Sequence, residues 1–197
     1  SDAYDIVQKK FVDDSNSFNK DLSTFFRHKL TAKIAEQRSL IFNIGVSKYK
    51  RQNKYLESVD YKKNYYEGDT FETELRIKED FLDGNLIYGI NQSKDVYNSA
   101  DISDKEQAMT DIFFNHFQKY YNYTFTYGAR LTHNENFGDH LVYKASLQNE
   151  ILKERLRVGA ILGTGFKAPS TFQQFAPVNS FGKNGNKDLT PEKSLNW

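Results

Sequence analysis

The chain contains 197 residues, with 27 basic and 26 acidic side chains and no cysteine. This balance lacks the one-sided charge that binding to nucleic acid requires, so we expect no nucleic-acid partner. The absence of cysteine excludes a disulfide framework and a thiolate metal site. No window approaches the roughly 18 apolar residues that a membrane helix needs. A transmembrane barrel stays open, because its strands are polar at alternate positions.

An alternation of apolar and polar residues with a period of two dominates the chain and predicts β-strands. The pattern is clearest at residues 40–50, 69–81, 123–132, 140–148 and 154–163, and weaker at 27–36, 86–95 and 106–118. The segment 106–118 also fits a short helix. No proline interrupts any of these segments, as pairing within a sheet requires. We therefore predict an all-β chain with about eight or nine antiparallel strands.

The predicted connections alternate in length. Short turns are expected at residues 37–39, 82–85, 119–122 and 151–154, and long polar loops at 52–68, 97–105, 133–139 and 166–194. Outer-membrane barrels show this asymmetry, with short periplasmic turns and long outer loops.

Alternation alone does not decide whether the apolar face packs on a core or faces lipid, since a soluble β-sandwich produces the same pattern. The predicted strands of about 9–13 residues are longer than the mean strand of soluble proteins and match the length of tilted membrane strands. An aromatic cluster beside one turn fits an interfacial girdle better than a core. Its members are Phe113, Phe114, Phe117, Tyr120, Tyr121, Tyr123, Phe125 and Tyr127. These observations favour an antiparallel transmembrane β-barrel, with the soluble sandwich as the alternative.

In a barrel, the opposite face of the strands would line the lumen, where water solvates charged groups. The charged residues on that face are Glu72, Glu74, Arg76, Lys78, Asp80, Arg130, Lys144, Arg155 and Arg157. They could equally cover the outside of a sandwich, so they do little to separate the two folds.

Two short boxes near the end of the chain carry a family resemblance. The first is GTGFKAPS at residues 163–170, and the second is GNKDLTPEKS at residues 185–194. At this spacing they resemble the mid-barrel segment of TonB-dependent outer-membrane receptors, in the cobalamin and ferric-siderophore branch. The matching residues are Phe166, Lys167, Ala168, Pro169, Gly185, Asn186, Leu189, Pro191, Glu192, Lys193 and Ser194.

Local backbone structure explains the residues of both boxes without a ligand. Pro169 has no N–H and ends ladder pairing as the strand leaves the sheet. Asn186 and Asp188 favour turns, and Pro191 stands at a permitted position before the next strand. Lys187 departs from the usual proline of the family, which affects the local turn. We therefore expect the boxes to be mainly structural.

The resemblance implies that residues 1–197 are part of one receptor β-barrel domain, whose complete barrel has 22 strands around an N-terminal plug. The plug domain, the TonB box and the C-terminal strands are absent from this sequence, so we expect an internal fragment of a longer receptor. The implied partners are the TonB–ExbB–ExbD complex, acting through the plug region, a small-molecule metal chelate and bacterial outer-membrane lipid. No cofactor is implied.

By this resemblance the intact protein is an active transport receptor for a bulky nutrient chelate, either a ferric siderophore or cobalamin. The mechanism would be binding followed by energised gating. We find no nucleophile–base pair, phosphate loop or HExxH motif, so neither an enzyme nor a catalytic residue is predicted. The alternatives are a haem receptor of the same family, a passive porin or adhesin barrel, and a soluble all-β ligand-binding module.

We expect ligand contacts from the outer loops, where aromatic rings stand among adaptable polar groups. The candidates are Tyr55, Tyr61, Tyr65, Tyr66, Gln173, Gln174, Phe175 and Asn179. The same tyrosines could instead form an upper interfacial girdle. No metal site is expected, since none of His28, His116, His133 and His140 has ligand spacing to another. His133 and His140 end one predicted outer loop, which keeps the haem alternative open.

Overall fold

The computed structural model describes residues 2–5, 10–13, 17–55, 64–99, 104–152, 155–176 and 185–197. Within this part, nine strands form one antiparallel sheet in the order β11-β10-β9-β8-β7-β6-β5-β4-β3. Each strand therefore pairs with its neighbours in the sequence, which confirms the predicted series of hairpins. Strands β1 (Asp2–Asp5) and β2 (Lys10–Asp13) form a separate two-stranded sheet.

The strands of the large sheet are long. They are β3 (Ser17–Ala35), β4 (Arg38–Tyr55), β5 (Asn64–Phe81), β6 (Gly84–Ser99), β7 (Lys105–Tyr120), β8 (Tyr123–Asn134), β9 (Gly138–Leu152), β10 (Leu156–Lys167) and β11 (Glu192–Asn196). The 18 residues of β5 would reach about 60 Å at the usual rise per residue, well beyond a bilayer core. Residues 106–118 lie within β7, so the strand prediction for them is confirmed and the helix alternative is wrong.

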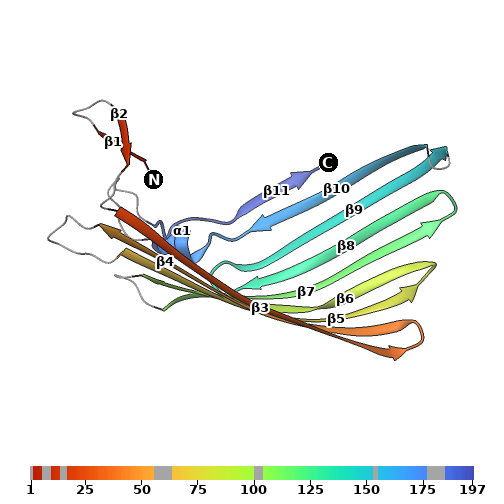
Figure 1. The fold of residues 1–197 in the computed structure, drawn as a ribbon. Helices are drawn as coiled ribbons and strands as arrows, with labels where there is room; N and C mark the ends of the chain where they lie inside the picture. Colours follow the sequence, from red (N-terminus) through yellow and green to blue (C-terminus); the bar gives the residue numbers. More distant parts are fainter. Residues whose placement is uncertain are drawn as a thin grey trace.

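One end of the sheet carries the short turns (Figure 1). The turn between β5 and β6 consists of Leu82 and Asp83, both with positive φ (48° and 54°). Two consecutive left-handed residues match the twist of the flanking strands in a two-residue hairpin. The predicted turns at 37–39, 82–85 and 119–122 are confirmed at this end, within a residue or two.

The other end, called the loop end below, holds the longer connections and the single described helix, α1 (Thr171–Phe175). One prediction for this end was wrong. Residues 133–139 do not form a long loop, because β8 continues to Asn134 and β9 begins at Gly138. The Asn134 side chain accepts hydrogen bonds from the backbone N–H groups of Asn136 and Phe137, at 2.9 and 3.1 Å, and so closes a three-residue turn.

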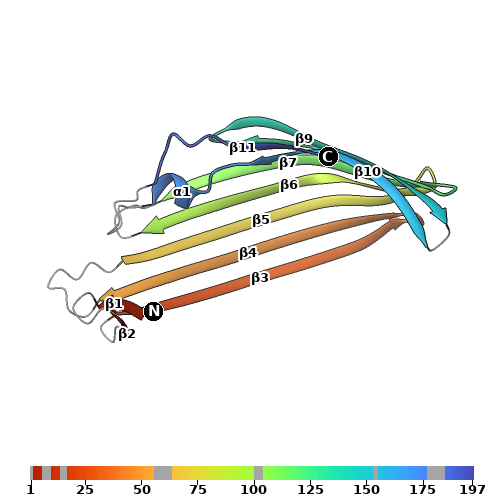
Figure 2. The same ribbon diagram turned by 90° about the horizontal axis from the view of Figure 1, so that it is seen from above.

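The sheet is curved into a trough, and its two faces differ (Figures 1 and 2). α1 lies over the concave face, against β6 and β7. Since side chains alternate across a strand, its contacts with Tyr66 and Tyr97 place the polar set Glu72, Glu74 and Arg76 on that face. The convex face carries the apolar set in aligned rungs; one rung runs through Phe42, Leu75, Ile90, Ile112, Leu131 and Leu141.

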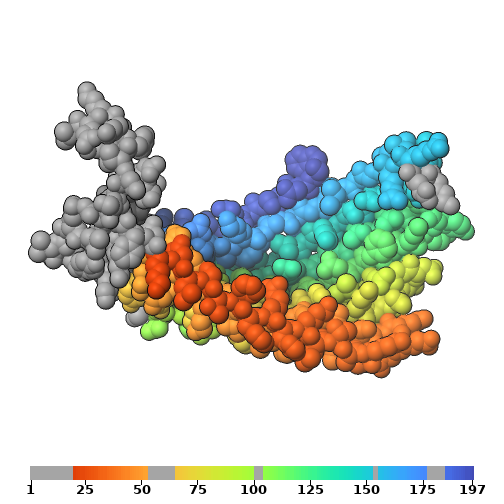
Figure 3. Space-filling view, viewed as in Figure 1, coloured from red at the N-terminus to blue at the C-terminus, as the bar shows by residue number. Residues whose placement is uncertain are grey.

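The described residues contain almost no closed apolar core. Only Ile41 and Tyr97 are buried among their hydrophobic residues, whereas Ile112 is 61% exposed and Leu141 62% exposed on the convex face. The strands form one continuous wall in the space-filling view (Figure 3), and no second described sheet packs against it. This arrangement does not fit a β-sandwich, whose two inner faces bury each other.

The predicted aromatic cluster surrounds the turn between β7 and β8. Tyr120, Tyr121 and Tyr123 are 57%, 81% and 39% exposed, so these rings do not pack into a core. Tyr120 and Tyr121 contact each other edge to face, with centroids 4.6 Å apart. Exposed tyrosines beside an apolar face are the composition of a membrane–water interface.

Among the described residues, no helix is long and apolar enough to cross a membrane.

Candidate ligand-binding site at the loop end of the concave face

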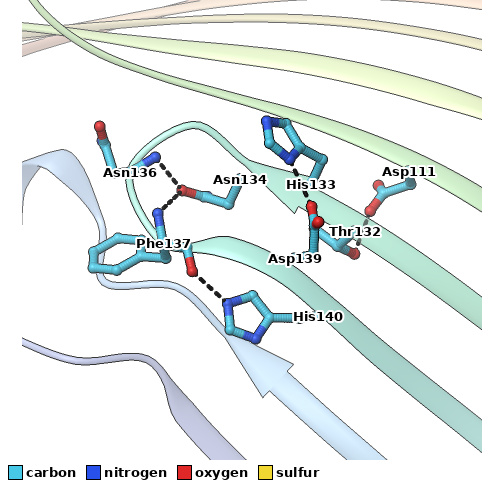
Figure 4. A network of polar contacts seen from close by, with 8 residues as sticks. All are labelled: Asp111, Thr132, His133, Asn134, Asn136, Phe137, Asp139 and His140. Carbon is cyan, nitrogen blue, oxygen red and sulfur yellow. Dashed lines mark hydrogen bonds and ion pairs between the residues drawn. The ribbon is translucent and has the colours of Figure 1, made fainter.

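The concave face is held in register by side-chain hydrogen bonds between adjacent strands. Asn43 donates to Glu74 at 2.7 Å, and Thr70 donates to Asp95 at 2.8 Å. Buried Asp111 accepts from Thr132 at 2.5 Å (Figure 4) and from Asn91 at 3.2 Å. A polar face whose groups pair across strands presents a fixed chemical surface to whatever enters the trough.

Helix α1 begins with a capping box. Ser170 Oγ accepts the N–H of Gln173 at 3.2 Å, and Gln173 Oε1 accepts the N–H of Ser170 at 2.9 Å. The reciprocal pair satisfies two backbone donors that a helix start leaves open. Gln174 is 5% exposed, and its amide donates to the Pro169 carbonyl at 3.0 Å and to Gln107 at 3.4 Å. The short helix is thus ordered by its own cap and tied to β7.

Three aromatic rings meet where α1 approaches the sheet. Phe172 contacts Tyr66 of β5 with centroids 6.0 Å apart and planes 72° apart. It contacts Tyr97 of β6 at 5.9 Å and 80°. Both arrangements are edge to face, the geometry that aromatic quadrupoles favour.

A groove of about 560 Å³ opens beside these rings. Tyr49, Arg51, Tyr66, Tyr97, Ser170 and Phe172 contribute to its lining. A concave site with several rings and a few polar groups is the usual form of a small-molecule site. We define this groove as the candidate ligand-binding site.

On one side of the groove, Arg51 forms a bidentate ion pair with Asp21. Its Nε and a terminal nitrogen donate to the two oxygens of Asp21 at 2.8 and 2.9 Å. The hydrogen bond from Arg51 holds the pKa of the Asp21 carboxyl below its usual range. The pair therefore persists at neutral pH and is lost only as the pH falls through that lowered pKa, when the carboxylate takes up a proton.

The predicted ligand-binding residues divide between the two faces. Tyr66 lines the groove, whereas its neighbour Tyr65 points to the opposite face, where Lys50 Nζ lies 5.8 Å from its ring centroid. The Phe175 ring has two lysines nearby, with the Nζ atoms of Lys105 and Lys187 at 5.6 and 5.8 Å from its centroid. The side chains of Gln173 and Gln174 take part in the α1 contacts above.

The side chains of three other predicted contacts lie outside the part of the chain that the structure describes. Tyr61 and Asn179 lie outside the described residues, and for Tyr55 only the backbone, at the end of β4, is described.

The two family boxes meet at the junction of β10, α1 and β11. Phe166 and Lys167 pair in the sheet with Lys193 and Glu192. The Gly185 N–H donates to the Ala176 carbonyl at 2.7 Å, and a Cβ on Gly185 would lie 2.5 Å from Gln174 O. Only glycine fits this approach without a shift.

The second box also closes its own turn. Asn186 Oδ1 accepts the N–H of Asp188 at 2.9 Å, as the turn prediction for Asn186 expected. Leu189 and Pro191 follow in the irregular segment that leads into β11. These contacts give the boxes a structural role at the α1 junction.

The histidines of the predicted haem alternative are engaged within the protein (Figure 4). His133 Nδ1 lies 2.6 Å from Asp139 Oδ1. His140 Nε2 lies 2.9 Å from the Phe137 carbonyl, and its ring stacks on Phe166 at 3.9 Å. No group of three or more potential metal ligands occurs among the residues that the structure describes.

Several groove residues were not predicted. Tyr97 was assigned to a loop but lies in β6, and Phe172 stands beside predicted residues without being selected. The alternation Asp95, Tyr97, Ser99 could have placed Tyr97 on the lumen face. Nothing in the sequence indicates that α1 folds back onto β6 and β7.

Comparison with known proteins agrees with this fold. Residues 3–197 match the family described as "TonB dependent receptor-like, beta-barrel". The chain therefore belongs to the TonB-dependent receptor β-barrel family.

Two solved structures from Pseudomonas aeruginosa are similar to the chain. One is the siderophore receptor PirA, with a TM-score of 0.60 and 16% identity, covering 91% of this chain and 42% of that one. The other is a mutant of the ferric enterobactin receptor PfeA, with a TM-score of 0.59 and 12% identity, covering 91% and 39%. The chain thus spans about two fifths of the length of these receptors, and the likeness concerns the fold.

Proposed function

We propose that the chain is barrel wall of a bacterial outer-membrane receptor that actively imports a bulky metal chelate, with TonB–ExbB–ExbD supplying the energy. The observation that carries the proposal is the aromatic groove at the loop end of the concave face of a family barrel. In this setting the convex face contacts lipid and the loop end faces outward. The plug and its contact with TonB belong to other parts of the receptor, and residues 1–197 form part of one barrel domain.

We propose different roles for the candidate ligand-binding residues around the groove. Tyr66 contacts the ligand directly, and Tyr61 and Asn179, which the sequence assigns to outer loops, are proposed as further contacts. Gln173, Gln174 and Phe175 belong to α1 and hold it beside the groove. Tyr65 lies on the opposite face and supports the strand, and Tyr55 stays a predicted contact. Rings with adjacent polar groups suit a large amphiphilic chelate.

Between the two ligand classes, we propose a ferric siderophore rather than cobalamin. Support comes from the two similar structures, of which one is named a siderophore receptor and the other a ferric enterobactin receptor. The haem alternative has less support, because His133 and His140 each have a partner within the chain.

The first test uses the full-length receptor in its native cells. Membranes are fractionated, and samples are run boiled and unboiled on a denaturing gel. We expect a faster-migrating unboiled form, confined to the outer-membrane fraction. A soluble protein without a heat-dependent shift would overturn the barrel-receptor proposal.

The second test measures uptake. Cells with the intact receptor, without it, or without TonB are offered radioactive ferric chelates and radioactive cobalamin. Receptor- and TonB-dependent uptake of a ferric chelate is the expected result. Uptake of cobalamin alone would retain the transporter and exclude the siderophore.

A further inference from the structure

A second pocket opens on the concave face, nearer to the short turns than the aromatic groove. Its volume is about 170 Å³. Four neighbouring strands each contribute a polar side chain to its lining, namely Asn115 of β7, Arg130 of β8, Lys144 of β9 and Thr164 of β10. Arg130 and Lys144 were both predicted to face the lumen, and neither lines the aromatic groove.

Glycines make room for this pocket. On the concave face Gly128 lies between Asn115 and Lys144, and Gly163 lies on the other side of Lys144. A Cβ on Gly128 would lie 2.5 Å from Asn115 Oδ1, and one on Gly163 would lie 3.3 Å from Lys144 Cβ. Because both neighbours of Lys144 in this row lack a side chain, the lysine stands in a hollow rather than in a packed row.

The pocket lies where β9 and β10 begin to separate. The backbone pairing of these two strands ends at Lys144 and Gly163. Beyond that point the Tyr143 N–H donates to the side-chain oxygen of Thr164 at 3.0 Å. Since the hydroxyl oxygen acts as the acceptor of this bond, its proton is free to be donated to a group in the pocket.

The cations of the pocket have no acidic partner. Within the part of the chain that the structure describes, neither Arg130 nor Lys144 forms an ion pair. By contrast, Arg76 on the same face lies 3.3 Å from Glu74. Asp111 of β7 already accepts hydrogen bonds from two neighbouring strands. Two cations that share a pocket repel each other, and an anion bound to both would offset this repulsion.

We propose that this pocket is an oxyanion site, in which Arg130 and Lys144 hold a single carboxylate or phosphate group. Guanidinium and ammonium groups form charge-assisted hydrogen bonds to such oxygens. The Asn115 amide and the Thr164 hydroxyl add neutral donors. The pocket is smaller than the usual site of a drug-sized ligand, so it takes one anionic group and not a bulky chelate.

The anionic group has two possible sources with the same chemistry. One is a free anion that enters the trough from solution. The other is the acidic side chain of a receptor segment outside residues 1–197. Two measurements on the full-length receptor, purified in detergent and checked for folding by the heat-dependent gel shift, distinguish these sources.

The first measurement tests for a free anion. Chloride is replaced by inorganic phosphate at constant ionic strength, and the temperature at which the fast-migrating form disappears is recorded. Phosphate bound to the folded receptor should raise this temperature. In Arg130→Gln and in Lys144→Gln, the phosphate concentration that gives half of the rise should increase at least about 10-fold. Lys144→Arg keeps the positive charge and should keep the response.

Lys78→Gln is the matched control for Lys144→Gln. Lys78 lies in the same row of the concave face as Lys144, joined to it through Ile87, Asn115 and Gly128. It does not line the pocket. The substitution removes the same charge from the same face, so the phosphate response should stay at its natural strength.

The second measurement tests for an acidic side chain of the receptor. A carbodiimide joins a carboxylate to an amine in direct contact, with loss of water, and tryptic peptides are then analysed by mass spectrometry. If a receptor carboxylate occupies the site, Lys144 becomes linked to an Asp or Glu outside residues 1–197, and Lys78 does not. In that case phosphate has no effect, and Lys144→Gln lowers the melting temperature more than Lys78→Gln does.

The outcomes decide both the site and the source of its anion. A phosphate response that needs Arg130 and Lys144 supports a site for free anions, and a link at Lys144 supports an internal carboxylate. If neither is found, or if Lys78→Gln has the same effects as Lys144→Gln, the pocket is not an oxyanion site. These measurements need no transported substrate, so their result is independent of the proposed function.

Discussion

At the residue scale, Gly89 of β6 lies close to the backbone of the neighbouring strand β5. A Cβ at this position would lie 2.3 Å from the Leu75 carbonyl oxygen and 2.8 Å from the Arg76 Cα. These are backbone atoms, so they cannot turn aside as the end of a flexible side chain could. Glycine within a strand marks such close contacts.

We therefore predict that Gly89→Ala destabilises the barrel by about 1–3 kcal/mol, because β5 and β6 must move apart. The temperature at which the fast-migrating form disappears on a gel of the full-length receptor should fall. Gly68→Ala is the matched control, because no atom lies within 4 Å of its added Cβ. Equal melting temperatures for the two variants would contradict the prediction.

Charged residues near the loop end explain why the strands are longer than the sequence predicted. Lys48, Lys50, Glu67 and Asp69 stand on the convex face but near the loop end, where the face is charged. Both faces of the strands are polar there, so the period of two disappears although the ladder continues. This is why the predicted strands ended early and why Tyr97 was placed in a loop.

At the element scale, the strands and short turns follow from local patterns, but the position of α1 does not. Alternation predicted the hairpins, and the short gap between two alternating segments at residues 82–85 predicted the turn between β5 and β6. The segment after Pro169 was predicted as an irregular loop, since five helical residues produce no periodic signal. Its docking depends on Phe172 and Gln174, whose contacts lie on strands more than 60 residues away in the sequence.

The capping box provides a test of α1 itself. Ser170→Ala removes the acceptor for the N–H of Gln173 and should cost about 1 kcal/mol of local stability. We expect faster amide hydrogen exchange at residues 171–176 of the full-length receptor, measured by mass spectrometry. Ser170→Asp retains an acceptor and should keep exchange slow. Fast exchange in both variants would show that the cap does not order the helix.

At the scale of the whole molecule, the difference between the two faces predicts opposite responses to charge. Ile90 is 40% exposed on the convex face in the middle of β6, and Ser93 faces the trough on the same strand. A lysine on a lipid face near the bilayer midplane costs about 2–4 kcal/mol, whereas the lumen tolerates it.

Ile90→Lys should therefore reduce the amount of folded receptor in the outer membrane, and Ser93→Lys should leave it near the natural level. Both are measured from the heat-shifted band in membrane fractions. If the two lysines reduce the folded receptor to the same extent, the convex face does not contact lipid.

Two cross-strand ion pairs bound the apolar band of the convex face on β4. Arg38 pairs with Glu79 near the turn end, and Lys48 pairs with Asp69 at 3.3 Å toward the loop end. On β4 the residues between them on this face are Leu40, Phe42, Ile44 and Val46. The ten residue steps from Arg38 to Lys48 measure about 33 Å along the strand, or about 23 Å in height at a tilt near 45°. In the proposed receptor, the spacing of these two cross-strand ion pairs suits the barrel to a thin membrane, and a thicker one would have to compress around it or draw a charged pair into its hydrocarbon.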